Sequence, residues 1–368
     1  MELTVDKRAL KDVLDWSKRV APEQGVLALK ADGDTLTAQI PNDVGEHHES
    51  AVVSEVKQAG SGLVSRPVLL NTVDSMSGST LSLTREGSTL VVVGEDGSSS
   101  LGVEDTRIVE APEVTVLARM KQADFQYAVQ GVKESVGKRS FKGTGNILNG
   151  FVTVRDGETT LYATNRFLSY RATVKTRTRD VEPQSFGITP LKWGGSVTQM
   201  TSRLELVVTE RGFYGLRDGQ TIDTFVPVDA SDVEKIAGVL DDLHAASASD
   251  SSLVVPKPKF NQALNTLKKQ GTNVKARVHH DGESLYVDAE ADRFSSSKAV
   301  SASDVEGSGF DRVLFPDNMM KALRTVKSKT VQLRFPEDSR YPVGVYSNDS
   351  ETLDALSFVM TVREKGAV

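Results

Sequence analysis

The chain carries the same turn signal three times at a nearly constant spacing. Asp-Gly dipeptides interrupt three strand-like stretches, VLALKADGDTLTAQI, GFVTVRDGETTLYAT and ARVHHDGESLYVDAE. Their glycines, Gly33, Gly157 and Gly282, are 124 and 125 residues apart. Asp-Gly favours a two-residue turn in which both central residues take positive φ, so each stretch predicts two antiparallel strands. A period of this length is typical of tandem domains and is too long for a solenoid.

Two further features repeat with the same period. A proline near the start of a short predicted helix occurs at Pro67, Pro190 and Pro316, at separations of 123 and 126 residues. Proline suits a first helical turn because the N–H that it lacks has no helical partner there. A longer helix precedes each Asp-Gly hairpin, in DKRALKDVLDWSKRV, QADFQYAVQGVKES and PKFNQALNTLKKQ, and another hairpin follows each proline helix. The sequence therefore predicts an α+β fold with six helices, two in each copy, packed on antiparallel sheets.

Three copies account for all 368 residues and predict domains at 1–112, 113–246 and 247–368. The boundaries fall in VEAPEVT and LHAASASDSSL, where small, polar and proline residues interrupt the pattern. Cysteine is absent, which excludes disulfides, thiolate metal sites and cysteine nucleophiles. No apolar run approaches the length of a membrane span and the N-terminus lacks an apolar signal core, so we expect a cytoplasmic protein.

The positive charge is predicted to gather on helices, although the formal net charge of the chain is -6. In the first helix the basic residues fall in one sector and the apolar residues on the opposite side. One such stripe is ordinarily a solvated face, but equivalent helices of the other copies are basic too. This arrangement suits a polyanion that is bound without sequence readout. The residues expected to face it are Lys7, Arg8, Lys11, Lys18, Lys133, Lys138, Arg139, Lys192, Lys268, Lys321 and Arg324.

The sequence offers no recognisable catalytic, metal or cofactor motif. The pairs His47-His48 and His279-His280 would point to opposite sides of a strand, and His244 falls in a predicted linker. GVKESVGKRS departs from a phosphate loop in its spacing and lacks the required Ser or Thr, and GTGNILNG lacks the third glycine of a dinucleotide motif. We therefore predict a non-catalytic protein with no metal and no cofactor.

Several segments resemble the bacterial DNA polymerase III β subunit, the ring-shaped sliding clamp that serves as a processivity factor. MELTVDKRALKDVL resembles the first strand and helix of that family, and ILNGFVTV followed by LYATNRFLSYRATV resembles the hairpin of its middle domain. LSFVMTVR resembles its closing strand. Asn165 and Thr361 stand where the family usually has Asp and Pro. These departures fit a divergent member of the family, and one hypothesis is that a phage encodes it.

The resemblance implies three clamp-type domains in a crescent and a head-to-tail homodimer that closes a ring around double-stranded DNA. Strands would form the outside of the ring, and the basic helices would face the DNA. The implied interface pairs an edge strand around Leu101 and Val103 with the third domain near Leu267 and Gly271. The ring would tether a replicative DNA polymerase, a clamp loader and other proteins that carry a clamp-binding motif.

The resemblance also implies a peptide-binding pocket between the second and third domains. Its expected members are Leu148, Thr164, Arg166, Phe167, Leu168, Phe358 and Met360. Two alternatives stay open at this point. Leu148, Phe358 and Met360 would also suit an ordinary core, and the chain could be a clamp-fold adaptor that binds peptide motifs without encircling DNA.

Overall fold

The structure is a computed structural model of the chain. It describes residues 1–137, 149–155, 157–177, 182–246, 251–271, 274–281, 283–291, 294–307, 309–338, 341–350 and 353–362. Lys138, Arg139 and Leu148, three of the predicted site residues, lie outside the described residues, as do the turn residues Asp156 and Gly282. No helix within these ranges is long and apolar enough to cross a membrane.

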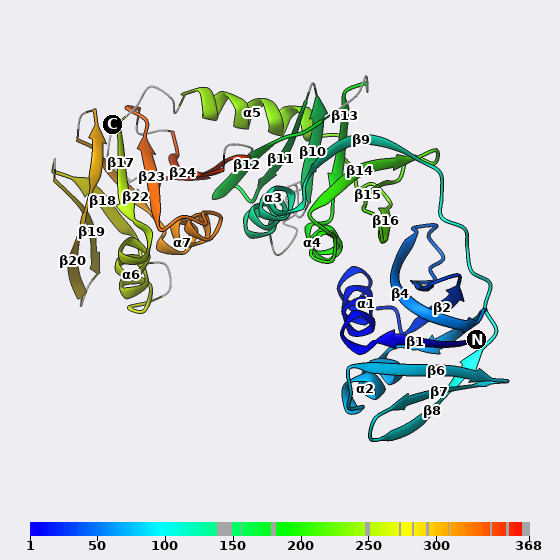
Figure 1. Cartoon of the computed structure of the whole chain (residues 1–368). Helices are drawn as coiled ribbons and strands as arrows, with labels where there is room; N and C mark the ends of the chain where they lie inside the picture. Colours follow the sequence, from blue (N-terminus) through cyan, green and yellow to red (C-terminus); the bar gives the residue numbers. More distant parts are fainter. Residues whose placement is uncertain are drawn as a thin grey trace. The chain divides into compact units, whose positions relative to one another are not determined.

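The first copy runs as strand, helix, four strands, helix and three strands (Figure 1). Its elements are β1 (Glu2–Asp6), α1 (Lys7–Val20), β2 (Val26–Asp32), β3 (Thr35–Gln39), β4 (His48–Gln58), β5 (Gly60–Ser65), α2 (Arg66–Ser75), β6 (Thr80–Glu86), β7 (Thr89–Gly94) and β8 (Gly97–Glu104). The side chain of Asp6 begins α1 by accepting a hydrogen bond from the Ala9 N–H at 2.8 Å. This bond satisfies one of the N–H groups that a helix start leaves unpaired.

The second copy repeats this order of elements. They are β9 (Val114–Lys121), α3 (Gln122–Ser135), β10 (Gly150–Arg155), β11 (Glu158–Thr164), β12 (Leu168–Lys175), β13 (Gln184–Ile188), α4 (Pro190–Val197), β14 (Arg203–Thr209), β15 (Tyr214–Arg217) and β16 (Thr221–Phe225). A further helix, α5 (Val233–Ala246), follows.

The third copy has the same order with one additional strand, β21. Its elements are β17 (Ser251–Pro256), α6 (Lys257–Lys268), β18 (Ala276–His280), β19 (Ser284–Ala291), β20 (Phe294–Ser301), β21 (Ser303–Glu306), β22 (Asp311–Leu314), α7 (Pro316–Arg324), β23 (Thr330–Phe335), β24 (Val343–Ser350) and β25 (Leu353–Val359).

The repeated turn and helix signals are confirmed. The three Asp-Gly segments connect the antiparallel pairs β2–β3, β10–β11 and β18–β19. Gly33 and Gly157 take φ values of +59° and +81°, which the turn requires. Pro67, Pro190 and Pro316 lie in the first turns of α2, α4 and α7.

The prediction of six helices is wrong, because the described residues contain seven. The seventh, α5, includes His244, which the sequence placed in a linker. Val233, Ala237 and Leu240 of α5 are buried in a small core beside β10, β11, β24 and β25. The segment ends in the small residues Ala245 and Ala246, which resemble a linker in composition. Only the sheet covered by Val233, Ala237 and Leu240 identifies a helix face.

The chain divides into two compact units, and the division passes through the second copy. Unit 1 comprises Met1–Gln126, Arg177–Val181 and Leu191–Pro227, and unit 2 comprises Tyr127–Thr176, Glu182–Pro190 and Val228–Val368. In unit 1, β9 and β14 to β16 continue the antiparallel sheet of the first copy. In unit 2, β10 to β13 continue a sheet of the third copy. The division into three domains stays a prediction.

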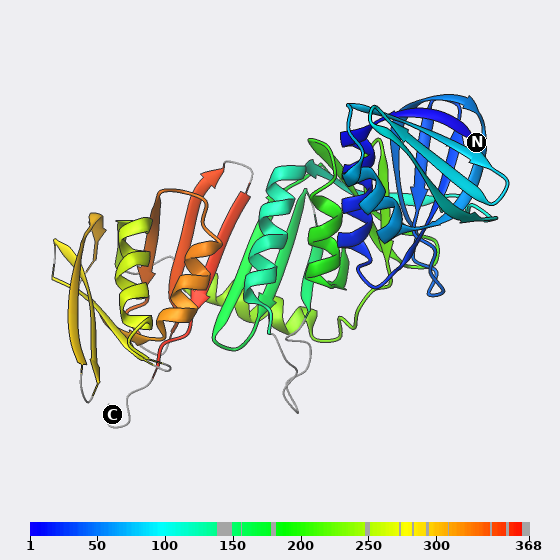
Figure 2. The ribbon, with the colours of Figure 1, turned by 90° about the horizontal axis from the view of Figure 1, so that it is seen from below.

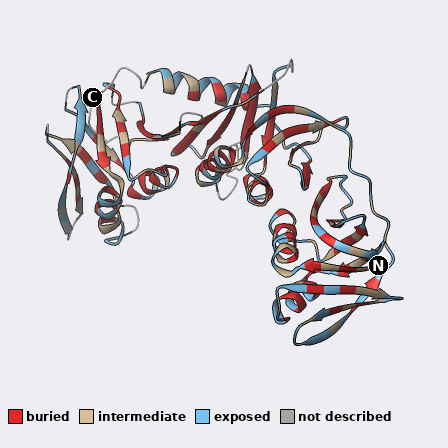
Figure 3. Cartoon of the chain, in the orientation of Figure 1, coloured by how far each residue is buried: buried red, intermediate tan, exposed pale blue. Residues whose placement is uncertain are grey.

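The helices cover the sheets with their apolar faces (Figure 3). In unit 1, Val13, Trp16 and Val20 of α1 are buried, as the periodicity predicts. In unit 2, α6 and α7 pack side by side (Figure 2). Their residues Phe260 and Leu323 belong to one core with apolar residues of β17 to β20 and β22 to β25.

Candidate functional site

The copies are joined by strand pairing that follows one rule. The third strand after the first helix of one copy pairs antiparallel with the last strand of the next copy. In this way β4 pairs with β16, and β12 pairs with β25. The rule leaves two strands without such a partner. They are β20, the third strand after α6, and β8, the last strand of the first copy.

Both of these strands have an open edge among the described residues. β20 pairs only with β19 and ends its four-stranded sheet. β8 pairs with β7 from Gly97 to Gly102 and meets β5 only at Val103 and Glu104. An unpaired strand edge is a template for pairing with another chain. Exposed Lys298 lies on β20, and exposed Glu104 lies at the end of β8, beyond its open part.

The residues expected at a dimer interface fall into three situations. Leu101 and Val103 lie on β8 but face the core, so their side chains are not available at its edge. Leu267 is fully buried in α6 and packs inside the core of unit 2. Its side chain cannot meet a second chain, which corrects that part of the prediction. Gly271 follows α6 and is exposed.

The basic residues expected to face a polyanion differ in their exposure and in their contacts within the chain. Arg8 and Lys18 on α1 and Lys133 on α3 are exposed, and Lys321 on α7 is half-buried. The others form contacts within the chain: Lys11 with Asp74, Lys192 with Glu46, Lys268 with Asp317, Arg324 with Glu134, and Lys7 with the Met76 carbonyl. Surface ion pairs exchange easily, so Lys11, Lys268 and Arg324 remain available at a modest cost. Lys192 is held more firmly, because its partner Glu46 is only 8% exposed.

A buried chain of charged groups lies where β4 pairs with β16 in unit 1. His48 is 2% exposed, and its Nδ1 lies 3.0 Å from Asp223 Oδ1 while its Nε2 lies 3.2 Å from Glu46 Oε2. Trp16 Nε1 donates to the other Asp223 oxygen at 3.0 Å, and Lys192 Nζ donates to Glu46 at 2.9 Å. Both imidazole nitrogens face a carboxylate oxygen, so both must donate, and His48 is an imidazolium.

The surroundings of His48 and Glu46 shift the pKa values of both groups. Burial lowers the pKa of His48, but the hydrogen bonds to Asp223 and Glu46 outweigh it and raise the pKa above 6.5. Burial raises the pKa of Glu46, but hydrogen bonds from His48 and Lys192 outweigh it and lower the pKa from 4.5 to about 2. The network therefore favours the charged forms of His48 and Glu46. The sequence indicated no role for His48, because its partner Asp223 lies 175 residues away.

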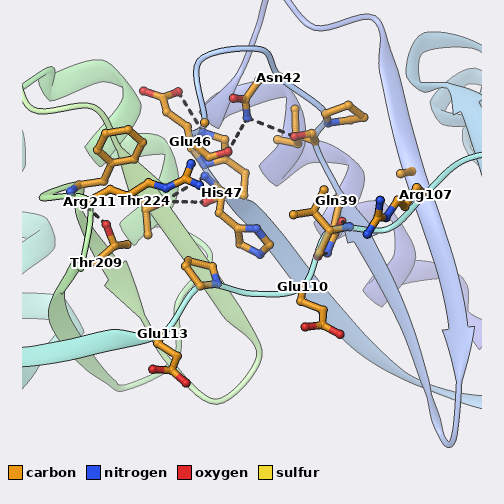
Figure 4. A pocket seen from close by; sticks show the side chains of 18 of the residues that line it. Gln39, Asn42, Glu46, His47, Arg107, Glu110, Glu113, Thr209, Arg211 and Thr224 are labelled. Atoms are coloured by element: carbon orange, nitrogen blue, oxygen red, sulfur yellow. Dashed lines mark hydrogen bonds and ion pairs between the residues drawn. The ribbon is translucent and has the colours of Figure 1, made fainter.

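A cavity of about 540 Å³ adjoins this network (Figure 4). It is lined by residues 39–42 and 45–48, by the turn between β14 and β15, and by the segment that follows β8. Arg107 and Arg211 share its wall with Glu110 and Glu113. Glu46 and Glu210 also line the cavity, so its lining carries charges of both signs.

A groove of about 620 Å³ lies in unit 2 between the turn that joins β11 to β12 and the helices α6 and α7. Its lining combines apolar and basic side chains. The apolar ones include Phe167, Val274 and Phe315, and the basic ones are Lys268, Lys269 and Lys321. A volume of this size is typical of ligand sites in proteins.

The turn beside the groove is held by its own hydrogen bonds. The Asn165 side chain accepts from the N–H groups of Phe167 at 3.0 Å and Leu168 at 2.9 Å. The Thr164 hydroxyl accepts from the Arg166 N–H at 3.2 Å. Arg166 has a φ of +76°, a left-handed conformation that non-glycine residues adopt at an energetic cost. This conformation leaves Phe167 54% exposed at the groove.

The residues predicted for the peptide pocket are only partly brought together. Phe167 lines the groove, and its carbonyl accepts from the N–H of half-buried Met360 at 3.0 Å. Leu168 and Phe358 are fully buried in two different cores of unit 2, so their side chains do not line the groove. The prediction is corrected for these two residues, because both faces of the paired strands β12 and β25 are covered. Leu148 lies outside the described residues.

Comparison with known proteins gives a match in structure but not in sequence. No protein-family model and no curated protein sequence matches the chain. A DNA polymerase sliding clamp from Pseudomonas aeruginosa is 15% identical with a TM-score of 0.78. The β subunit from the DNA polymerase of Streptococcus pyogenes is 10% identical with a TM-score of 0.79, and DNA polymerase III β subunit from Thermotoga maritima is 15% identical with a TM-score of 0.78.

Each of these matches covers 99% of this chain and 100% of the other chain. The chain therefore has the α+β fold of DNA polymerase sliding clamps, as the sequence resemblance implied.

Proposed function

We propose that this protein is a non-catalytic DNA sliding clamp, a ring that encircles duplex DNA and tethers a replicative polymerase. The match to clamp structures over the whole chain supports the proposal. The observation that carries it is the strand-pairing rule, which is satisfied twice within the chain and leaves β20 and β8 open.

The same rule supports a head-to-tail homodimer. If β20 of one chain pairs with β8 of a second chain, and β8 of the first with β20 of the second, all six copies follow the rule and no such edge remains. Unlike edges that pair head to tail generate a closed ring when the rotation between chains returns to its start. Lys298 on β20 and Glu104 at the end of β8 would place opposite charges beside this interface.

The proposed contact with DNA is electrostatic and independent of sequence. Arg8, Lys18 and Lys133 are exposed on the first helices of two copies, where they can meet phosphates. Because few cations would engage at once, direct affinity for linear duplex should be weak and should fall as salt rises. Retention would come from the closed ring. A replication role of this kind belongs in the cytoplasm of a bacterial cell.

The proposed partners are the polymerase, a clamp loader and other proteins with a short docking motif. The groove beside Phe167 supports this part of the proposal, because it combines an exposed aromatic side chain with further apolar residues. An apolar groove of this size can take a few side chains of a peptide.

A clamp-fold adaptor that binds peptides without encircling DNA is a second candidate. It is favoured by the ion pairs at Lys11, Lys192, Lys268 and Arg324, which reduce the positive charge offered to phosphate. An adaptor of this kind would be a stable monomer at micromolar concentration and would still bind peptides.

Ser100 in β8 offers a direct test of the ring. N–H groups alternate in direction along a strand, and the Val103 N–H donates to the Ser88 carbonyl at 2.9 Å on the β7 side. The Ser100 N–H therefore points to the open edge. Ser100→Pro removes that donor, whereas Ser100→Thr keeps it and serves as the matched control.

The measurement is native mass, combined with retention on nicked circular plasmid in the presence of a clamp loader. We expect wild type and Ser100→Thr to be dimers that stay on circular DNA and leave it on linearisation. We expect Ser100→Pro to be monomeric and not retained. A monomeric wild-type protein would refute the ring and favour the adaptor.

A further inference from the structure

The groove beside Phe167 is lined by apolar and basic side chains, called here its floor (Phe167, Val274 and Phe315) and its rim (Lys268, Lys269 and Lys321). Phe167 is 54% exposed, and Val274 and Phe315 are half-buried next to it. A large apolar side chain gains about 1.5–3 kcal/mol when it is moved from water into such surroundings. An aromatic ring held out by a strained turn is thus an anchor point for an apolar side chain of a partner.

The rim carries an excess of positive charge. Lys268 lies 2.7 Å from Asp317, so this pair is internally compensated. Lys269 and Lys321 also line the groove, and within the part of the chain that the structure describes neither forms an ion pair. Three ammonium groups against one carboxylate leave two positive charges unmatched at the groove.

These two features together select the chemistry of the partner. A phosphate backbone would meet the lysines but has no group for the apolar floor. A purely apolar peptide would fill the floor but leave the ammonium groups without partners. A peptide with both kinds of side chain satisfies the whole lining, and charge complementarity also speeds its encounter with the groove.

We propose that this groove takes a peptide segment in which an aromatic or large aliphatic side chain is flanked by Asp or Glu. The proposal rests on the peptide docking of the proposed function and names the chemistry of the motif. The apolar side chain packs on Phe167 and Phe315, and the carboxylates pair with Lys269 and Lys321. Arg166, which is exposed in the adjacent turn, adds a further cation near the entrance.

The test begins with a library of random decapeptides displayed on phage. The library is selected on the full-length wild-type protein and depleted on the Phe167→Ser variant, which removes the anchor. We expect the recovered peptides to be enriched in Asp and Glu on either side of an aromatic or aliphatic residue. Recovery without acidic enrichment, or no recovery that depends on Phe167, would overturn the proposal.

The second step measures binding of one recovered peptide by fluorescence anisotropy. A matched peptide carries Asn and Gln in place of Asp and Glu. The double variant Lys269→Gln with Lys321→Gln should weaken the acidic peptide about tenfold, since two exposed ion pairs are lost, and should leave the amide peptide within about twofold. High salt should reduce the difference. Lys235→Gln, on the exposed face of α5, is the control and should change neither affinity.

The same double variant is tested against a labelled 20-base-pair duplex. If the duplex loses affinity and the acidic peptide does not, the rim serves phosphate and the proposal is wrong. Retention on circular DNA is measured separately. A protein that is retained but shows no acidic preference would contradict this inference alone, whereas a wild-type protein that is not retained would contradict the clamp.

Discussion

Replacement of His48 by Gln is expected to destabilise unit 1 strongly and in a pH-dependent manner. Gln cannot place a donor on both sides of the former ring, so at least one of Asp223 and Glu46 loses its charged hydrogen bond. Asp223 is 0% exposed and cannot be rescued by water. Removal of one partner from a buried charged network costs about 3–5 kcal/mol.

The pKa of Glu46 supports this magnitude. Its lowering from 4.5 to about 2 corresponds to about 3 kcal/mol of net stabilisation by His48 and Lys192. Lys192 remains in the variant, so part of this stabilisation survives at Glu46. The loss at Asp223 adds to the rest, and we expect a total near 3 kcal/mol. Small domains are stable by about 5–15 kcal/mol in all, so the effect is easily measured.

Tryptophan fluorescence during urea unfolding provides the assay. The chain has two tryptophans, and both Trp16 and Trp193 are buried in unit 1. The signal therefore reports the unit that contains the network. His279→Gln is a matched control, because His279 is half-buried in unit 2 and pairs with Asp288. This control should leave the tryptophan transition unchanged.

The direction of the pKa shift of His48 determines how the effect of His48→Gln on stability depends on pH. The pKa of His48 is raised on folding, so its stabilisation is complete below 6.5 and is lost as pH rises through the folded value. The difference in free energy of unfolding between wild type and His48→Gln should therefore narrow as pH rises above 6.5. A loss below about 1 kcal/mol at pH 6, or a gap that does not change with pH, would refute the imidazolium network.

Three other outcomes are expected. In acid, unit 1 of the wild type should lose stability as pH falls below 4.5 towards 2, because the stabilisation contributed by Glu46 is lost when its carboxylate is protonated. If Lys192→Met does not change the tryptophan unfolding transition in this pH range, the role of the Lys192–Glu46 pair is contradicted. Gly131→Ala should destabilise unit 2 by about 1–3 kcal/mol despite the better helix propensity of Ala, because the added Cβ would lie 2.0 Å from Tyr170 Cζ. Gly238→Ala in α5 is the control, because nothing lies within 4 Å of the added Cβ there. Equal unfolding midpoints of the two variants by circular dichroism would count against the close packing at Gly131. Arg166→Gly should stabilise the turn by about 1 kcal/mol, because glycine adopts the positive φ of this position without strain. A lower unfolding midpoint in unit 2 would show that the arginine side chain contributes more stability than the strain costs.

The repeated architecture could be predicted from the sequence because its signals are local. An Asp-Gly turn and a proline in a first helical turn depend on the φ values of a few neighbouring residues. The three hairpins and the three proline helices therefore appear where expected. The resemblance to clamps anticipated the fold for a related reason, since it rested on the order and spacing of these elements.

The site could be predicted only in part, because exposure depends on partners distant in sequence. Phe167 and Leu168 are adjacent and both apolar, yet the first lines a groove and the second is fully buried. Pairing of β12 with β25 decides between them, and these strands are far apart in the chain. Helix α5 was missed for the same reason, since Val233, Ala237 and Leu240 form a buried face only against the sheet beneath them.

The sequence by itself determined the triplication, the turns, the helix starts and the basic character of the first helix, because each is set by residues within one or two turns of the chain. Only the tertiary structure decided the rule by which copies join, the two edges left open and the protonated state of His48. Strand edges and buried charges acquire their partners across 146 residues or more, and no local sequence pattern predicts which of these groups folding brings together.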